Sequence, residues 1–302
     1  MKKAAKGWLI IAAALVLAGG GLFAGVMSTL GWDFSKLSTV RYETNTYEIG
    51  EAFSDISLTT DTADILFALS DDGKCRVACY EEENAGHFVA VEADALTIRI
   101  NNQKSWRDYI GFSLASPRIT VYLPQAEYQA LSINGGTGSV EIPEAFSFKN
   151  ADISSSTGNV VFRASVAETL KIKTSTGNVR AEKNAAGALD ISVTTGNAYL
   201  TDMACESVAS SGTTGNIALN NVISTGKISI ERSTGDVRFD HCDAAEIYVK
   251  TNTGSVTGNL LSSKAFAADT HTGRINVPAT AEGGKCEIIT STGDIQLTIA
   301  QP

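Results

Sequence analysis

The chain has 302 residues, of which 43% are hydrophobic and 19% charged, and its net charge is −9. This is the composition of an ordinary globular protein that is long enough for one or two cores. The acidic balance excludes the usual classes of nucleic-acid-binding protein, because phosphate binding needs a basic face and the sequence has none.

The first predicted element is an apolar helix within residues 1–32. Lys2, Lys3 and Lys6 precede it, and no charge occurs between Lys6 and Asp33. About 20 apolar residues can cross a hydrocarbon core of ~30 Å, and the basic end stays on the cytoplasmic side. We therefore expect a single-pass anchor in the cell membrane, with the bulk of the chain extracytoplasmic. The alternative is a cleaved signal peptide and a secreted chain.

Residues 33–130 contain short strand-like runs without a regular repeat. The runs are Ile56–Phe67, Lys74–Tyr80, His87–Val91, Leu96–Ile100 and Ile119–Leu123. We interpret this region as degenerate first coils and a β-rich N-terminal cap, since a solenoid without a cap exposes its core and a strand edge. A loop at 101–116 carries Trp106, Tyr109 and Phe112. These aromatic residues are a candidate patch for a partner, or else the cap's own small core.

Residues 131–302 repeat a Thr-Gly dipeptide every 19 or 20 residues. The nine pairs are Thr137 and Gly138, Thr157 and Gly158, Thr176 and Gly177, Thr195 and Gly196, Thr214 and Gly215, Thr234 and Gly235, Thr253 and Gly254, Thr272 and Gly273, and Thr292 and Gly293. A fixed period indicates a repeat architecture. This period is too short for a propeller blade of ~40 residues and suits one coil of a β-solenoid.

Aliphatic residues occupy fixed positions around each glycine. Around Gly177 they are Leu170, Ile172, Val179 and Ala181, at −7, −5, +2 and +4. This alternation predicts strands with one buried face on both sides of the glycine. The same parity predicts that the threonine at −1 points inward and that the phase slips at the glycine, which tolerates the positive φ of a bend. The Asn or Asp that often follows is expected to bond its own turn.

The predicted fold is therefore all-β. We expect a β-solenoid of about nine coils at 131–302, a β-rich cap at 33–130 and one transmembrane helix within 1–32. The nine Thr-Gly pairs are predicted to be a structural corner ladder and not a ligand motif displayed nine times.

No catalytic, metal or cofactor site is predicted. The five cysteines are odd in number and lack CxxC spacing, which favours small buried residues over a disulfide framework for most of them. They are Cys75, Cys79, Cys205, Cys242 and Cys286. His241 and Cys242 are neighbours in a strand and should point to opposite faces, which argues against a Cys-His nucleophile. His271 is expected to face outward.

Three other chemistries are disfavoured by the outward positions. Polysaccharide cleavage needs converging carboxylates, whereas Glu231, Lys250 and Asp269 at −4 predict only a surface ion-pair ladder across successive coils. Repeated calcium binding needs more Gly-Asp pairs than those at Asp236 and Asp294. Ice binding through Thr-x-Thr rows is disfavoured because the predicted parity turns both threonines inward.

At these motifs the chain resembles a bacterial family. The segments that carry the resemblance are "GWDFSKLST", "DISLTTDTADILF", "ITVYLPQAEYQALSINGGTGSVEI" and the serial "TSTGNV" and "TSTGDI" units. They resemble the DUF-class putative adhesins with Thr-Gly-containing β-strand repeats. The resemblance implies a β-solenoid ectodomain on a bacterial envelope and no catalytic residues. Some relatives are linked with envelope stress signalling.

The sequence thus favours a non-catalytic, membrane-anchored extracytoplasmic protein that serves as an adhesin or cell-envelope interaction scaffold. The alternative is an envelope-stress sensing or regulatory protein that acts through membrane partners. The expected partners are the membrane, through the helix, and a surface glycan, matrix or envelope protein. No nucleic acid and no cofactor are expected.

Overall fold

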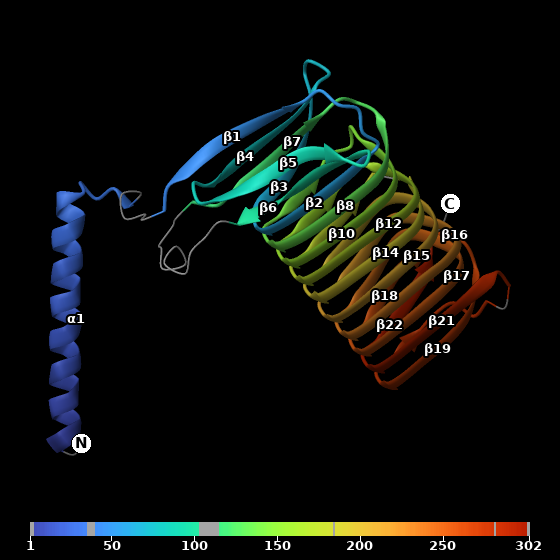
Figure 1. The fold of residues 1–302 in the computed structure, drawn as a ribbon. Coiled ribbons are helices and arrows are strands. Elements are labelled where there is room, and N and C mark those ends of the chain that lie inside the picture. The colour runs from blue at the N-terminus through green and yellow to red at the C-terminus, as the bar shows by residue number, and fades with distance from the viewer. Residues whose placement is uncertain (1–2, 35–39, 103–114, 184, 281, 301–302) are drawn as a thin grey trace.

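A computed structural model describes residues 3–34, 40–102, 115–183, 185–280 and 282–300. Within these ranges the chain forms one α-helix followed by a 22-stranded sheet. The sheet winds into a β-solenoid of about eight turns, close to the nine expected from the repeats, and the helix stands apart from it (Figure 1). The predicted all-β solenoid with a leading helix is confirmed.

Helix α1 (Lys3–Thr29) is apolar on all sides. Its segment Lys6–Thr29 has a mean hydropathy of 2.4, and the rest of the described chain does not cover it. Trp8, Leu17 and Leu22 are each more than 70% exposed. A helix that is hydrophobic all round is buried in a core or in a lipid phase. By length and composition this one could cross a membrane, and a signal sequence has the same properties.

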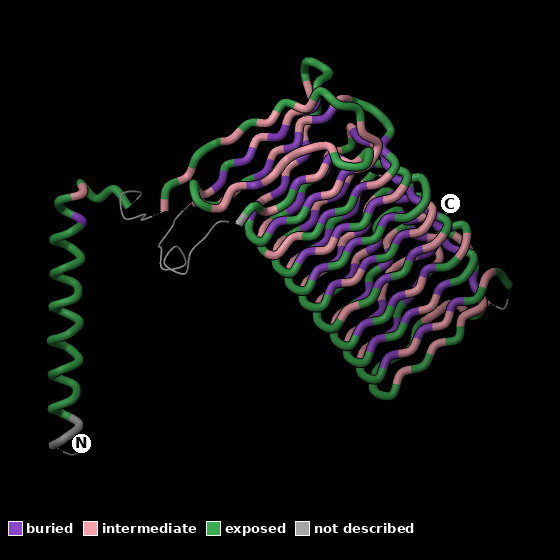
Figure 2. Tube along the Cα trace, viewed as in Figure 1, coloured by how far each residue is buried: buried purple, intermediate pink, exposed green. Residues whose placement is uncertain are grey.

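Each repeat contributes a strand before its Thr-Gly corner and a second strand after it. The strands are β8 (Glu127–Thr137), β9 (Val140–Ile142), β10 (Ser147–Thr157), β11 (Val160–Phe162), β12 (Ser165–Thr176), β13 (Val179–Glu182), β14 (Ala185–Thr195), β15 (Ala198–Thr214), β16 (Ile217–Thr234), β17 (Val237–Thr253), β18 (Val256–Leu260), β19 (Lys264–Thr272), β20 (Ile275–Asn276), β21 (Gly284–Thr292) and β22 (Ile295–Ile299). Equivalent strands pair in parallel, so that Ile153 lies beside Ile172 and Val160 beside Val179. The aliphatic columns therefore stack into one continuous core (Figure 2).

The cap adds antiparallel strands to the two strand stacks at the N-terminal end of the solenoid. Its elements are β1 (Tyr42–Ile49), β2 (Asp55–Thr62), β3 (Asp64–Leu69), β4 (Cys75–Glu82), β5 (Ala85–Glu92), β6 (Ala95–Asn102) and β7 (Arg118–Leu123). Strand β4 pairs with β1 and β7, and β5 pairs with β6, all antiparallel. A change from parallel to antiparallel pairing ends the solenoid without leaving the first coil uncovered.

The glycine corners of successive coils are in direct backbone contact. All nine glycines have φ between +129° and +158°, a region that disfavours other residues. In eight of the nine repeats, all but that of Gly273 in the outermost coil, the glycine N–H donates to the carbonyl of the threonine in the adjacent coil at 2.8–3.0 Å. A Cβ on Gly177 would overlap the carbonyl oxygen of Gly158. Both conformation and space thus require glycine here.

The threonines before these glycines face outward, so the predicted inward orientation is wrong. Ser155 pairs with Thr174 and Thr157 with Thr176, whereas Ser156 has no partner in that register. The alternation therefore slips at −2, before the glycine, as at a β-bulge. Ser155 and Thr174 are buried, while Ser156, Thr157 and Thr176 are exposed. The same omission recurs along the stack.

The −3 column is mixed, and three of its five hydroxyls bond the carbonyl of a corner glycine. The hydroxyl of Thr251 donates to the carbonyl of Gly235 at 3.3 Å, and that of Thr290 to the carbonyl of Gly254 at 3.1 Å. An unpaired buried hydroxyl costs roughly 1–3 kcal/mol, and among the described residues those of Ser155 and Thr174 have no partner. The column thus ties the core to the corner only in the C-terminal repeats.

One member of this column, Arg232, is a buried cation that is 4% exposed. Its guanidinium lies where a side chain on Gly212 would be, and donates to the hydroxyl of Ser210 at 2.9 Å. Burial lowers the pKa of Arg232 to about 10. Small residues in the neighbouring coil, at positions where other repeats carry larger ones, provide the space for this side chain.

The coils at both ends of the solenoid are not stacked in chain order. Strand β21 lies between β17 and β19, and β22 between β18 and β20, so the last repeat is inserted before the preceding one. At the other end, β2 lies between β6 and β8, and β3 between β7 and β9. The C-terminal swap buries Ile288 and Ile295 fully and leaves Ala268 and Ile275 partly exposed. The more apolar repeat is covered on both sides, as the hydrophobic effect favours.

The swap also corrects the predicted ion-pair ladder. Glu231 lies beside Lys250, but Lys250 lies beside Ile289, and Asp269 is on the far side of Ile289. The three charges are therefore not in successive coils of the stack.

Replacing Gly196 with valine should destabilise the solenoid, because a side chain would overlap the carbonyl oxygen of Gly177 at a φ of +138°. We expect a loss of about 1–3 kcal/mol or more in unfolding free energy, measured by circular dichroism on the detergent-solubilised chain. Gly50→Val is the matched control, since a Cβ there meets no atom within 4 Å. Equal stability of the two variants would contradict a constrained corner.

The swapped coil order predicts which engineered cysteines can be joined. Asn252→Cys with Ser291→Cys should form a disulfide on oxidation, because adjacent coils are ~4.8 Å apart and both positions are exposed. Asn252→Cys with His271→Cys should not, because these positions are two coils or ~9.6 Å apart. Gel mobility with and without reductant distinguishes the pairs. Stacking in chain order would give the opposite result.

Candidate functional site

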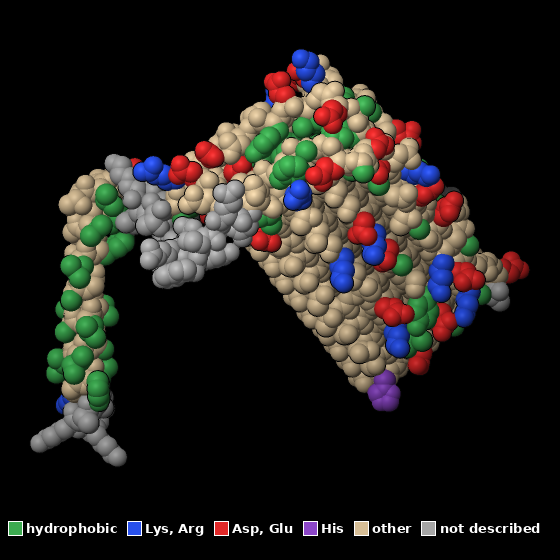
Figure 3. All heavy atoms as spheres, in the orientation of Figure 1, with side chains coloured by type: hydrophobic (Ala, Val, Ile, Leu, Met, Phe, Trp, Pro, Cys, Tyr) green, Lys and Arg blue, Asp and Glu red, His purple; other side chains and the backbone are tan. Residues whose placement is uncertain are grey.

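The most extended surface feature of the solenoid is the face formed by its corners. We define the corner face as the residues at −2, −1 and +1 of the nine repeats. The −1 residues are all threonine, and the −2 residues are Gly136, Ser156, Ser175, Thr194, Thr213, Ser233, Asn252, His271 and Ser291. Apart from Gly136 these side chains are exposed. Figure 3 shows the result as a broad band along one edge of the solenoid without charged or hydrophobic side chains.

The asparagines at +1 are used by the fold. The side-chain oxygen of Asn159 accepts a hydrogen bond from the backbone N–H of Asn178 at 2.9 Å, and Asn178 accepts one from Asn197 at 3.0 Å. The ladder continues through Asn216 to Asp236. Each side chain thus bonds the next coil and not its own turn, which corrects the predicted role. These oxygens satisfy backbone donors that the bend would otherwise leave unpaired.

The threonine hydroxyls on the same face are available to a ligand. Within the described parts of the chain, the hydroxyls of Thr157, Thr176, Thr195 and Thr214 make no hydrogen bond to protein atoms, and these residues are exposed. Parallel stacking places equivalent hydroxyls ~4.8 Å apart along the rod. The corner face therefore presents a regular row of free hydrogen-bonding groups on a rigid backbone.

Charged residues occur on the corner face only in the C-terminal repeats, at the end of the solenoid away from the cap. The +1 residues there are Asp236, Arg274 and Asp294, with Ser255 between the first two in the chain. The guanidinium of Arg274 lies 3.7 Å from the carboxylate of Asp294, and both side chains are exposed. Such a pair contributes little to stability. From Ser139 to Asn216 the face is uncharged, which suits a neutral, hydrogen-bonding partner.

Sequence reasoning missed this face because it assigned the −1 threonines to the core. A signal was present: the −2 position is Ser, Thr or Asn in seven repeats and is never aliphatic. Neighbouring residues of a strand point to opposite faces, so two adjacent polar columns cannot both point inward. The slip in the inward–outward alternation could therefore have been placed before the glycine. The argument against ice binding required both threonines of a Thr-x-Thr pair to point inward. It fails because Thr174 is buried and Thr176 is exposed.

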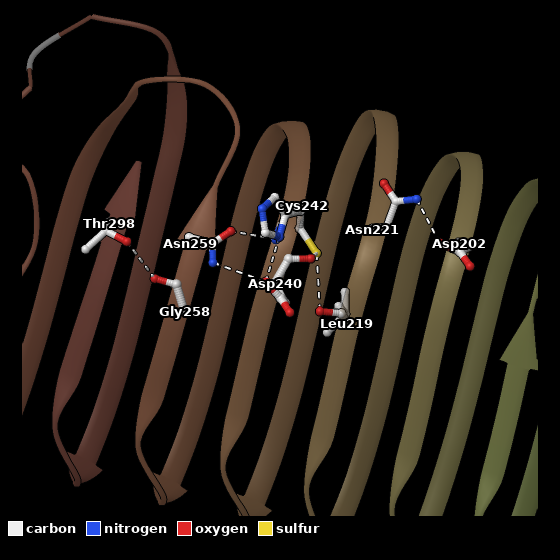
Figure 4. A network of polar contacts seen from close by, with 9 residues as sticks. Asp202, Leu219, Asn221, Asp240, Cys242, Gly258, Asn259 and Thr298 are labelled. Carbon is white, nitrogen blue, oxygen red and sulfur yellow. Dashed lines mark hydrogen bonds and ion pairs between the residues drawn. The ribbon is translucent and has the colours of Figure 1, made fainter. Parts of the chain in front are cut away.

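The other candidate residues from the sequence do not assemble a reactive centre, and Trp106, Tyr109 and Phe112 lie outside the described residues. His241 is exposed and Cys242 is buried, as expected. The ring Nδ1 of His241 lies 2.7 Å from the carboxylate of Asp240. Hydrogen bonds from Asn259 and His241 lower the pKa of Asp240, while burial raises the pKa of the Cys242 thiol. Cys242 donates instead to the carbonyl of Leu219 at 3.4 Å (Figure 4).

The remaining cysteines are equally unsuited to nucleophilic chemistry. All five are buried, as predicted for most of them, and they are free of disulfides. Burial raises the pKa of Cys75, Cys79 and Cys286 to about 12 and that of Cys205 to about 11. The thiolate is the reactive form, and these thiols are protonated at neutral pH. His271 faces outward, as expected.

Comparison with known proteins places the chain in a family. The family model described as Toastrack DUF4097 matches residues 53–298. Among solved structures, a putative adhesin from Bacteroides fragilis is 16% identical with a TM-score of 0.48, over 85% of this chain and 97% of that one. A putative adhesin from Parabacteroides merdae is 13% identical with a TM-score of 0.47, over 85% and 96%. No curated protein matches. Because the family model spans most of the solenoid and its cap, the chain belongs to the Toastrack DUF4097 family.

Proposed function

We propose that this chain is a non-catalytic, membrane-anchored extracytoplasmic protein that uses its corner face to hold a neutral glycan of a cell envelope or matrix. The observation that carries the proposal is the uncharged row of free threonine hydroxyls along the solenoid. Single hydroxyl contacts are weak, but many contacts repeated along one rigid rod add up through effective concentration. A chain-like partner with repeated hydroxyls matches such a row.

The absence of reactive groups on this face supports a binding role. The nine repeats carry no lysine, arginine or carboxylate at −2 or −1. Acid–base chemistry on a glycan needs two carboxylates that converge across the scissile bond. The described corner residues offer neither this pair nor an activated nucleophile.

The apolar helix supports anchoring at the cap end of the molecule. Strand β1 begins at Tyr42, only 13 positions after α1 ends at Thr29. A linker of that length reaches at most ~45 Å. The cap is therefore held near the membrane, while the corner face extends away from it. Control of membrane partners in envelope stress is the competing function and needs no glycan.

The corner face is tested by adding charge. The double variant Ser175→Glu with Thr194→Glu should weaken binding to neutral envelope polysaccharide at least about tenfold, because each carboxylate must be desolvated against uncharged hydroxyls. The matched control is Ala185→Glu with Ala204→Glu, two exposed positions in adjacent coils away from the corner. Biolayer interferometry on the detergent-solubilised chain measures both. Equal affinities of the two variants, or no polysaccharide binding by the unmodified chain, would contradict the proposal and favour the regulatory function.

The anchor is tested separately. Leu15→Arg with Leu17→Arg should release the chain from alkali-washed membranes, since each arginine at a helix centre costs about 2.5–3.5 kcal/mol. Leu15→Ala with Leu17→Ala is the control and should remain bound. N-terminal sequencing of the unmodified chain should find residues 1–32 in place. A mature chain that begins after this segment would show that it is a cleaved signal.

A further inference from the structure

The cap contains a buried polar cluster that the corner face does not involve. Strand β4 alternates strictly, and its inward residues Cys75, Val77 and Cys79 are followed by Glu81 on the same face. Glu81 is 1% exposed and His87 on β5 is 8% exposed. The strand predicted from the sequence ends at Tyr80, one residue too early to place a carboxylate in the core. Period-two parity extended to Glu81 is the signal that could have found it.

Glu81 and His87 are held together by an ordered set of contacts. One carboxylate oxygen of Glu81 lies 2.6 Å from Nδ1 of His87 and accepts the backbone N–H of His87 at 2.8 Å. The other oxygen accepts the side-chain amide of Asn45 at 2.8 Å. On the far side of the ring, Nε2 of His87 lies 3.1 Å from the hydroxyl of Thr60. The carboxylate and the imidazole therefore have fixed orientations.

A third potential ligand completes the cluster. The sulfur of Cys79, a carboxylate oxygen of Glu81 and a ring nitrogen of His87 all lie within 4.8 Å of one another. Thiolate, imidazole and carboxylate are the donors that zinc takes in proteins, whereas calcium and magnesium prefer oxygen alone. The set thus matches a transition ion of the zinc class.

The surroundings are those of a ligand set with outer support. Metal-bound histidines usually bond a second group through the nitrogen that does not bind the metal. Thr60 occupies that position at Nε2, which leaves Nδ1 directed at Glu81, and Asn45 orients the carboxylate in the same way. A buried Glu-His pair alone is a poor stabiliser, because desolvation offsets its attraction. A bound dication would supply the compensating charge.

Space for a fourth ligand is present beside the cluster. A cavity of about 370 Å³ is lined by Thr60, Glu81, His87 and Ile100, among others, and opens to the surface of the cap. Zinc sites with three protein ligands keep a fourth position for water or a small molecule. Cys79 does not line this cavity, so the thiol would bind from the core side and the open position would face the cavity.

We propose that Cys79, Glu81 and His87 form a site for a zinc-class divalent ion, with the fourth coordination position open to the cap cavity. Binding displaces the thiol proton, so the ligand is the thiolate. The site joins β4 to β5, and through Thr60 it joins both strands to the first coil. The metal would therefore couple the cap to the solenoid.

The test uses cobalt(II) as the probe, added to the metal-stripped full chain in detergent. The expected result is one cobalt per chain, with a thiolate-to-cobalt charge-transfer band and a raised melting temperature. Cys79→Ser should abolish the band. The matched control is Cys75→Ser, a buried cysteine on the same face of the same strand, which should retain it. A missing band in the unmodified chain, or its loss in the control as well, would overturn the site.

A second variant keeps the test decisive if Cys79→Ser fails to fold. Thr60→Val is nearly isosteric and removes only the hydroxyl that orients His87. It should weaken cobalt affinity roughly 10- to 100-fold while the circular dichroism spectrum is unchanged. Unchanged affinity in Thr60→Val would contradict the proposed coordination through Nδ1.

Discussion

The contact between glycine corners of successive coils is the constraint on which the rest of the structure depends. In eight of the nine repeats the glycine N–H reaches the threonine carbonyl of the adjacent coil at 2.8–3.0 Å, and a Cβ on any of the nine glycines would overlap the backbone of its neighbour. The coils can stack this closely only because the corner has no side chain. Once the corner is set, the aliphatic columns on both sides fall into register and form one core.

The corner also determines what the surface displays. The bend removes one residue per coil from the pairing ladder and turns two adjacent side chains outward. The asparagine after the glycine is drawn into bonding the next coil, so the free groups are the hydroxyls before it. A binding face made in this way has the spacing of the backbone itself. Its regularity is a consequence of the stacking that stabilises the fold.

The two ends of the solenoid differ in what covers them, and the buried polar cluster lies at the cap end, outside the corner face. At the cap end, antiparallel strands cover the first coil and enclose the Glu81–His87 pair. At the other end, the repeat with the weaker apolar pattern is placed outermost, with Ile275 47% exposed. The buried Glu81–His87 pair lies in the cap, where strands from distant parts of the chain meet. The repeats carry the corner face, which is uncharged from Ser139 to Asn216.

The sequence by itself determined the period, the buried columns, the glycine corners, the cap region and the apolar helix. These follow from local alternation and from the special backbone of glycine, both of which are visible in a single repeat. Three features were decided by the tertiary structure: the outward turn of Thr176, the swapped order of the end coils and the meeting of Glu81 with His87. Each depends on which backbone lies in the adjacent coil or strand. A repeat carries its own alternation, but its neighbours are selected by hydrogen bonding and burial across the whole stack.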